Sequence, residues 1–351
     1  MKTALKEIQN HINADLPFVL FRYPNKDNVK GLLQLDDKLH HASDFSSDGF
    51  IFSPYDKNKE IILLPKKYSS ITKCASSEFV TSKNKKSINV NLSNSIKENY
   101  LEMIKKAVLA IKNGDFTKVV LSRIQKVEIG SVKCLELFSR IIEKYSNAFC
   151  YCWYHPKVGL WLGATPERLL YMKGNTLSTV SLAGTLSAGS NNERSWTPKE
   201  VKEQQIVTDY IVSALKKYAD NIQVGTTQTV KAGSLLHLRT LITCVISDSE
   251  NQLKELVYAL HPTPAVCGIP LKSTIDFISK IEGYDRSFYT GFLGEVNRSS
   301  AEIAFYVNLR CMQLKNSQAY IYVGGGVTEE SLPEKEFEET VKKTSIMSAI
   351  L

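Results

Sequence analysis

Apolar residues recur along the chain with two different spacings. Leu101, Ile104, Val108 and Ile111 follow one another at intervals of three or four, which predicts a helix that ends near Gly114. Other segments predict helices before residue 17 and over about 131–145, 197–218 and 331–351. Continuous or alternating apolar runs predict strands over 17–21, 31–35, 49–54, 60–65, 118–129, 149–154, 159–164, 168–173, 176–185, 241–246, 302–314 and 319–327.

The order of these elements indicates the fold class. Several strands follow one another between groups of helices, and strand and helix do not alternate strictly. This order favours an α/β protein of the α+β type, with mainly antiparallel sheet, over a doubly wound fold. A polar stretch over roughly 69–94 reads as a connector. Capping boxes are predicted at Thr197 to Glu200 and at Ser331 to Glu334, where two of the helices begin.

Composition excludes several classes of protein. The 351 residues are 43% hydrophobic and 23% charged, which is typical of a globular protein. The net charge of +8 is spread along the chain, so we expect no nucleic-acid partner. No apolar run approaches the ~18 residues of a membrane span, and no signal-peptide core is present at the N-terminus. Seven scattered cysteines without a CxxC motif indicate a reduced, cytoplasmic protein.

Two pairs of glutamates are candidates for a metal site. Glu200 and Glu203 are three residues apart on one predicted helix, and Glu336 and Glu339 have the same spacing on another. Each pair therefore lies on one helix face, and hard oxygen ligands of this kind suit Mg²⁺. Two alternatives remain open. Glu200 also occupies the third position of a capping box, and the segment KEFEETVKK has the composition of an exposed charged helix.

Further candidates lie at the ends of predicted strands. Lys118 begins an apolar strand, where it could be a solvated lysine or, in a dry site, a general base. Glu167 follows a strand, where it could be a turn residue or a buried acid with a raised pKa. The glycines at 324–326 would let the backbone approach an anion. His237 and Arg310 read by default as a core histidine and a surface arginine.

The motifs occur in an order that resembles the chorismate-utilising enzymes, which include the isochorismate, salicylate, anthranilate and aminodeoxychorismate synthases. The resemblance runs from about 95 to 345 and rests on the motifs KVVLSR, GATPE, SLAGT, KEVKEQQIV, HLRT, HPTPAVCG, EGYDRSFYTGFLGEV, NLRC, VGGGV and EKEFEET. It implies a single large domain of two stacked antiparallel sheets flanked by helices. Residues 1–94 would form a variable part of the sheet scaffold with a connector, and 95–351 the catalytic region.

The resemblance also implies roles for individual residues. Lys118 would be the base that activates water, and Glu167 the acid that protonates the hydroxyl leaving C4 of chorismate. The metal site would hold Mg²⁺ against the ring carboxylate through Glu200, Glu203, Glu336 and Glu339. The residues implied to surround the substrate are Gly184, Thr185, His237, Ala265, Tyr289, Arg310, Gly324 and Gly326.

Three residues select among members of that family. Ala183 stands where aminodeoxychorismate synthases have a lysine, and Lys118 is the base that anthranilate synthases lack. Ala265 stands where salicylate synthases tend to have threonine. We therefore expect a monomeric isochorismate synthase. A salicylate synthase is the alternative, and a catalytically inactive binding subunit is a third, less favoured one. The motifs do not choose among menaquinone, siderophore and salicylate pathways.

Overall fold

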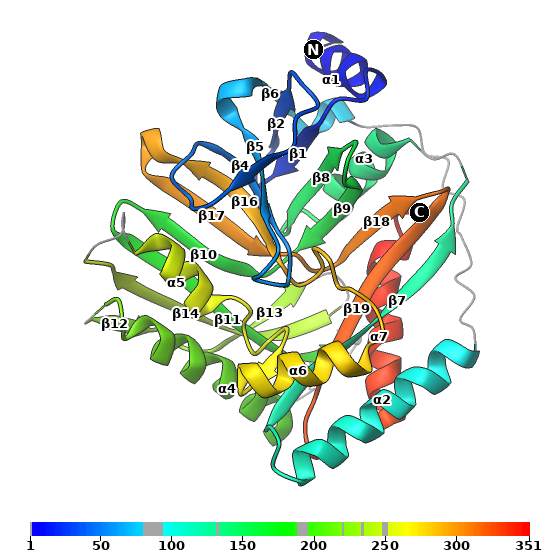
Figure 1. The fold of residues 1–351 in the computed structure, drawn as a ribbon, viewed down its shortest axis with the longest axis vertical. Helices are drawn as coiled ribbons and strands as arrows, with labels where there is room; N and C mark the ends of the chain where they lie inside the picture. Colours follow the sequence, from blue (N-terminus) through cyan, green and yellow to red (C-terminus); the bar gives the residue numbers. More distant parts are fainter. Residues whose placement is uncertain are drawn as a thin grey trace.

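The predicted strands pair into two large antiparallel sheets, which helices flank on their outer faces (Figure 1). The computed structural model describes residues 2–79, 94–130, 133–187, 196–219, 221–232, 235–247 and 252–351. Its helices are α1 Lys2–Asn13, α2 Asn94–Lys112, α3 Cys134–Lys144, α4 Pro198–Leu215, α5 Leu253–Leu260, α6 Leu271–Ile281 and α7 Pro333–Ser348. The strands are β1 Phe18–Arg22, β2 Asn28–Gln34, β3 His40–Ala42, β4 Gly49–Ser53, β5 Ile61–Pro65, β6 Ser69–Ala75, β7 Lys118–Glu128, β8 Phe149–His155, β9 Gly159–Thr165, β10 Arg168–Lys173, β11 Thr176–Ser187, β12 Ile222–Val224, β13 Gln228–Ala232, β14 Leu235–Val245, β15 Gly268–Ile269, β16 Phe292–Asn297, β17 Glu302–Val307, β18 Cys311–Lys315 and β19 Gln318–Val327.

Strands that lie far apart in the sequence are neighbours in both sheets. The order in the first, sheet A, is β15-β7-β19-β18-β9-β8-β1-β2-β6. The order in the second, sheet B, is β12-β14-β11-β10-β17-β16-β4-β5-β3, with β13 paired to β14. The α+β class with two antiparallel sheets is therefore confirmed. Strands from the N-terminal part occur in both sheets, so they are a structural part of the scaffold.

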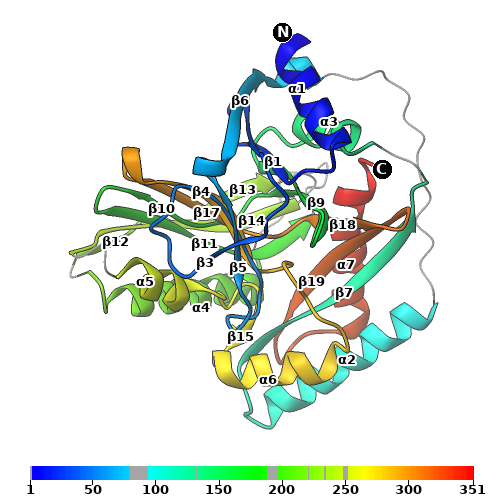
Figure 2. The same ribbon diagram turned by 45° about the horizontal axis from the view of Figure 1, so that its top comes forward.

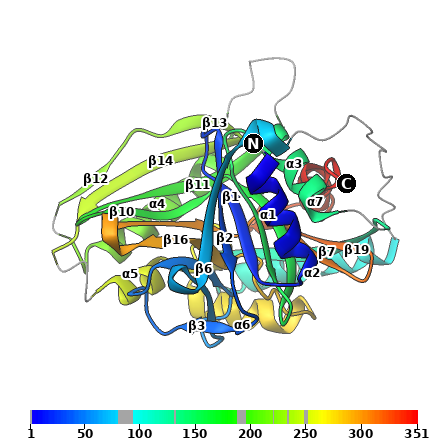
Figure 3. The same ribbon diagram turned by 90° about the horizontal axis from the view of Figure 1, so that it is seen from above.

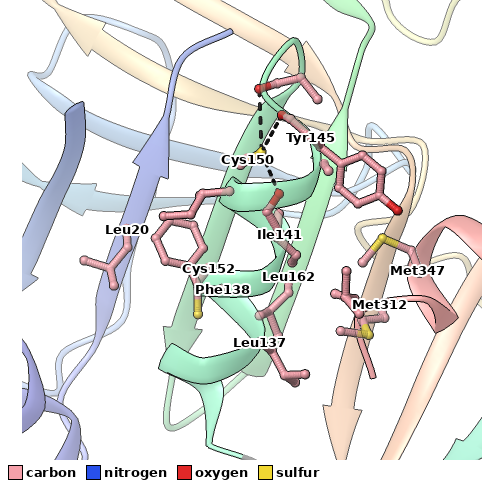
Figure 4. Close-up of a cluster of buried hydrophobic side chains, with 14 of the residues drawn as sticks. Leu20, Leu137, Phe138, Ile141, Tyr145, Cys150, Cys152, Leu162, Met312 and Met347 are labelled. Carbon is pink, nitrogen blue, oxygen red and sulfur yellow. Dashed lines mark hydrogen bonds between the residues drawn. The ribbon is translucent and has the colours of Figure 1, made fainter. Parts of the chain in front are cut away.

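Aromatic side chains fill the space between the two sheets. Phe52 of sheet B stacks on Phe288 with ring centroids 4.1 Å apart, and Phe149 of sheet A stacks on Tyr306 of sheet B at 4.2 Å. Their large buried area holds the inner faces together. The outer face of sheet A is covered by α1 and α3, and Figure 4 shows Leu137 and Phe138 of α3 packed over the sheet. The helices α4 and α5 cover sheet B.

The remaining helices gather at the end of sheet A formed by β7 and β19. The helices α2, α6 and α7 pack there around a separate apolar cluster. Figure 2 shows the three helices beside β7 and β19. Seen from above in Figure 3, the C-terminus lies beside α3, where Tyr145 donates a hydrogen bond to the carbonyl of Ile346. This arrangement places α4 and α7, the two helices that carry the acidic pairs, against the two sheets. No helix within the described ranges is long and apolar enough to span a membrane.

Three details of the predicted elements were wrong. The stretch 69–94, predicted as a connector, begins with the strand β6, which pairs with β2 in sheet A. The predicted strand 302–314 is divided between β17 of sheet B and β18 of sheet A, because the chain crosses between sheets at 308–310. Asn308 fixes the crossing by accepting a hydrogen bond from Tyr151 at 2.6 Å and donating one to the carbonyl of Phe288 at 2.9 Å. The helix α7 begins at Pro333, and its N-cap Leu332 has no side-chain capping bond. Ser331 instead accepts a hydrogen bond from the backbone of Thr328.

Candidate active site

Most of the predicted site residues line one cavity of about 520 Å³. Its wall includes Glu167, Gly184, Thr185, Glu203, His237, Ala265, Arg310, Gly324, Gly326 and Glu339. These residues come from β11 and β14 of sheet B, β19 of sheet A, the two helices α4 and α7, and three connecting loops. The fold therefore brings together residues that are separated by almost half of the chain.

Local backbone irregularities shape the wall of this cavity. The pairing of β11 with β14 shifts its register between Ala183 and Leu186, and Gly184 inside this bulge has a φ of 73°. Such a backbone angle favours glycine. Arg310 also has a positive φ, 48°, where the chain crosses between the two sheets. This conformation is uncommon for a non-glycine residue and is typical of functional sites.

Lys118 lies behind the cavity wall and forms an ion pair with Glu203. Its side chain is 0% exposed, and its Nζ is 2.9 Å from Oε1 of Glu203. The contact lies off the direction of a hydrogen bond, and Nζ has no hydrogen-bond partner among the described residues. Burial alone would raise the pKa of Glu203, but Lys118, helped by Lys199 and Lys343, lowers it. The carboxylate is thus held in its charged form beside a buried ammonium.

Glu167 lies on the cavity wall in the turn between β9 and β10. Its backbone carbonyl accepts a hydrogen bond from Val307 at 3.0 Å, which ties the turn to sheet B. The residue is only 5% exposed, and burial raises the pKa of its carboxyl group to about 7 although Lys118 and Arg310 oppose the shift. A carboxyl group with such a pKa exchanges a proton readily near neutral pH. It can therefore act as an acid at this position.

Arg310 and His237 form a hydrogen-bonded pair on the cavity wall. Nε2 of His237 is 3.3 Å from Nη2 of Arg310, and Nδ1 is 2.8 Å from the carbonyl oxygen of Gly184. A guanidinium group only donates, so Nε2 accepts and Nδ1–H donates to the carbonyl. Burial, together with the nearby Arg310, lowers the pKa of His237 to about 3. The imidazole is therefore neutral, and Arg310 retains its other N–H groups for a ligand.

Two of the predicted substrate-contacting or catalytic residues stand apart from this cavity. Tyr289 lines an adjoining cavity of about 410 Å³, which shares Ala265, Arg310 and Gly324 with the first. Its ring stacks on Tyr322 with centroids 5.4 Å apart. Lys118 is the second, since it lines neither cavity and lies beside Gly326. A methyl group on Gly326 would lie 2.6 Å from Oε1 of Glu203 and 3.2 Å from Cε of Lys118.

The predicted acidic residues do not converge on a single point. Glu336 accepts a hydrogen bond from Lys199 at 2.8 Å, and Glu339 forms an ion pair with Lys343 at 2.6 Å. Glu200 completes the capping box of α4, where its carboxylate is bonded to the backbone and hydroxyl of Thr197. Within the described residues, no three metal-ligating side chains stand close enough together to hold an ion. Each of the other three glutamates is instead engaged by a lysine.

Sequence reasoning missed two lysines of the site. Lys343 lines both cavities and donates a hydrogen bond to the carbonyl of Gly324 at 2.8 Å. Lys199 bridges from α4 to Glu336 on α7. The available signal was spacing, because Lys343 follows Glu339 by four residues and must share its helix face. Lys199 offered no signal beyond its position beside Glu200.

A buried ion pair on α6 and the loop that follows it supports the cavity from behind. Arg286 and Glu282 are 2% and 0% exposed and lie 2.6 Å apart. Arg286 also donates to the carbonyls of Val120 and Val266, at 2.7 and 2.8 Å. Val120 lines both cavities, and Val266 lies next to Ala265. The pair therefore fixes β7 and the 261–268 loop relative to each other.

Comparison with known proteins gives a consistent set of relatives. A family model described as "Chorismate binding enzyme" matches residues 51–351. The salicylate biosynthesis isochorismate synthase of Pseudomonas aeruginosa is 30% identical over 254 residues, which cover 70% of this chain and 53% of that protein. The vibriobactin-specific isochorismate synthase of Vibrio cholerae is 33% identical over 199 residues, 54% of this chain and 50% of the other. The matched region thus spans about half the length of each of these two curated relatives.

A solved structure shares the fold over nearly its whole length. It is described as a 2,3-dihydroxybenzoate-specific isochorismate synthase from Bacillus anthracis. The two chains superpose with a TM-score of 0.80 at 24% identity, over 97% of this chain and 98% of the other. The two-sheet architecture is therefore that of a known enzyme fold.

Proposed function

Because the chain belongs to the family of chorismate binding enzymes, we propose that it is an isochorismate synthase. The reaction adds water at C2 of chorismate and releases the C4 hydroxyl as water, so substrate and product are isomers. The observation that carries this proposal is a protonatable carboxyl group, Glu167, on a cavity backed by the buried amine of Lys118. A base and an acid are the two groups that the reaction needs. Both of the curated relatives described above are named as isochorismate synthases.

The charges of the cavity support binding of a dianion. Chorismate carries two carboxylates, and Arg310 and Lys343 supply two cations on the wall. In the proposed pose, Arg310, Tyr289 and the backbone at Gly324 and Gly326 hold the enolpyruvyl carboxylate. Charge-assisted hydrogen bonds of this kind are among the strongest that a protein makes. The neutral His237 would lie beside the ring, with Gly184 and Thr185 along another side.

In the proposed mechanism the two proton transfers occur on opposite sides of the ring. Lys118, as the neutral amine, takes a proton from the water that attacks C2. Glu167 in its acid form gives its proton to the hydroxyl that leaves C4. Nζ of Lys118 lies 2.9 Å from Oε1 of Glu203, so Glu203 must turn to another partner before Lys118 can contact the attacking water. The reaction is reversible because the two groups exchange roles in the other direction.

The carboxylate residues fit a divalent ion by their chemistry. Glu203 and Glu339 line the same cavity, and a methyl group on Gly325 would lie 3.8 Å from oxygens of both Glu336 and Glu339. Glu203, Glu336 and Glu339 each already pair with the side chain of a lysine, so this group of carboxylates holds cations. As placed, no three of them in the described part of the chain lie close enough together to hold an ion, so we propose that Glu203, Glu336 and Glu339, with Glu200, would hold Mg²⁺ once they have left their present partners. The bound ion would neutralise the ring carboxylate of the substrate.

A salicylate synthase is the second candidate, since it would use the same water chemistry and then eliminate pyruvate. Ala265 on the cavity wall favours the first candidate, because salicylate synthases tend to have threonine there. The experiment is chromatography of chorismate incubated with the protein and Mg²⁺, with a coupled assay for pyruvate. We expect isochorismate and chorismate at equilibrium and little pyruvate near neutral pH.

Variants test whether the named residues carry the activity. Lys118→Ala should reduce the rate by roughly 10²–10⁴, the usual effect of removing a positioned proton-transfer group. A dominant salicylate peak would select the second candidate. Formation of isochorismate by Lys118→Ala at nearly the wild-type rate would contradict the assignment of the base. An inactive wild-type protein that still binds chorismate would instead favour a binding subunit.

A further inference from the structure

The ion pair between Lys199 and Glu336 joins the two helices that carry the acidic residues. Lys199 is on the first turn of α4, and Glu336 is on the first turn of α7. Nζ lies 2.8 Å from Oε1, and the side chains are 27% and 3% exposed. The glutamate is thus buried, while its lysine is partly accessible to solvent. Burial raises the pKa of Glu336, Lys199 lowers it, and the neighbouring Glu339 raises it again.

The accessible side of this pair faces a wide groove. The groove, of about 2040 Å³, lies between α4, the segment after α2, β15 and residues 328–330. Lys199, Lys202 and Glu203 lie on its wall, and Glu203 also lines the active-site cavity. A cation that enters this groove therefore meets Lys199 before it reaches Glu336, which is bonded to Lys199 and does not itself line the groove.

We propose that Lys199 is a resident counter-cation that must leave Glu336 before a divalent ion can bind there. The inference rests on the proposed function only in taking Glu336 as one of the ion's ligands. An ammonium group and a divalent ion repel each other and compete for the same carboxylate oxygens. The lysine keeps the buried carboxylate neutralised until the ion arrives, so the protein avoids an unpaired internal charge. Lys199 is therefore a positioning residue, which sets the affinity for the ion.

The test is calorimetric titration of Mg²⁺ into the full-length protein without substrate, comparing Lys199→Met with Lys202→Met. Lys202 is the matched control because it lies on the same helix and the same groove, is exposed, and forms no ion pair within the described residues. Lys199→Met should bind Mg²⁺ about tenfold or more tightly, the ratio that corresponds to one charge-assisted hydrogen bond that no longer has to be broken. Lys202→Met should change the affinity for Mg²⁺ by less than about threefold.

A second readout and a second background separate the outcomes. Without metal, Lys199→Met should unfold at a lower temperature than the wild type, and Mg²⁺ should restore more stability to it than to Lys202→Met. In a Glu336→Gln background, removing Lys199 should give no gain in affinity for Mg²⁺.

Equal effects of the two lysine variants, or weaker binding by Lys199→Met, would overturn the proposal. If the wild type binds no Mg²⁺, both this inference and the proposed metal site are wrong. Tighter binding by Lys199→Met in a protein that forms no isochorismate would support the inference and contradict only the proposed reaction.

Discussion

The carboxyl group of Glu167 forms no ion pair with any lysine or arginine in the described part of the chain. Burial raises its pKa to about 7, and Lys118, Arg310 and Lys343 act on it only from a distance. A hydrogen-bonded lysine or arginine in direct contact would have held it as a carboxylate. The same residue type is therefore charged at Glu203 and protonatable at Glu167, because their contacts differ.

The first prediction concerns Glu167 and pH. Turnover of chorismate should fall as the pH rises through about 7, because the acid form is lost. Glu167→Gln should lower the rate by roughly 10²–10⁴ and remove this dependence. A pH profile of kcat tests both points, with Glu102→Gln on the exposed face of α2 as the control. An unchanged profile in Glu167→Gln would contradict the role of the acid.

The same shift of pKa predicts a change in stability. In the folded protein the pKa of Glu167 lies above the ordinary value of 4.5. The contribution of this carboxyl group to the stability of the fold is therefore complete below pH 4.5 and is lost as the pH rises through about 7. Above pH 7, Glu167→Gln should therefore be more stable than the wild type, by at most on the order of 3 kcal/mol. Urea denaturation at pH 5 and pH 8 measures the difference. If Glu167→Gln and the wild type were equally stable at pH 5 and at pH 8, this would contradict the burial assigned to the Glu167 carboxyl group.

Residue spacing and the resemblance together identified most of the cavity wall, but not the lysines that neutralise it. The i, i+3 pattern correctly predicts that Glu336 and Glu339 share a helix face. It cannot show that Lys199, from another helix, meets Glu336, because that contact depends on how α4 and α7 pack. Lys343 was missed for a different reason, because it belongs to a charged segment that is typical of a solvent-exposed helix.

At the scale of elements, the glycines at the end of β19 differ in what surrounds them. A methyl group on Gly326 would lie 2.6 Å from the carboxylate of Glu203, which is closer than van der Waals contact allows. A methyl group on Gly325 would have its nearest neighbours at 3.6–3.8 Å, which is ordinary contact. Both glycines have backbone angles that alanine can adopt. An alanine would therefore differ between the two positions only in the atoms that its methyl group meets, and not in the strain of its backbone.

Gly326→Ala and Gly325→Ala form a matched pair of variants for this strand. In Gly326→Ala the new methyl group would lie 3.2 Å from Cε of Lys118, so it should shift the base and lower kcat by about 10²-fold or more, the effect of misplacing a proton-transfer group. Gly325→Ala should stay within a few-fold of the wild type. Steady-state kinetics with melting temperatures of both variants checks the result. Equal losses of activity would show that Gly326 does not act by preserving the position of Lys118.

Most helices and strands followed from apolar periodicity, and the exceptions have physical causes. The run 302–314 has the residues of one long strand, but Asn308 satisfies its polar atoms by bonding to Tyr151 of sheet A and to the carbonyl of Phe288 in the loop before β16. The strand therefore ends there, and Arg310 is turned into the cavity. Periodicity reports which face of an element is buried, and it does not report which sheet a strand joins.

At the scale of the whole molecule, the strand order was accessible only through the resemblance. β1 pairs with β8, and β7 pairs with β19, although each pair is separated by more than a hundred residues. Alternation of polar and apolar residues cannot predict such partners. The cavity forms where the second of these pairs, β7 with β19, meets α4 and α7. The catalytic assignment thus depends on the folded molecule as a whole rather than on any single motif.

The central claim is that solvent water attacks C2 while the C4 hydroxyl leaves, and oxygen-18 tests it most directly. Chorismate is incubated with the protein and Mg²⁺ in oxygen-18 water, and the isochorismate is separated and analysed by mass spectrometry. The account predicts one oxygen-18 atom in each isochorismate molecule, at the C2 hydroxyl, and roughly 10²–10⁴ slower incorporation with Lys118→Ala. Isochorismate that contains no oxygen-18 would contradict the account, because the hydroxyl would then have moved within the substrate.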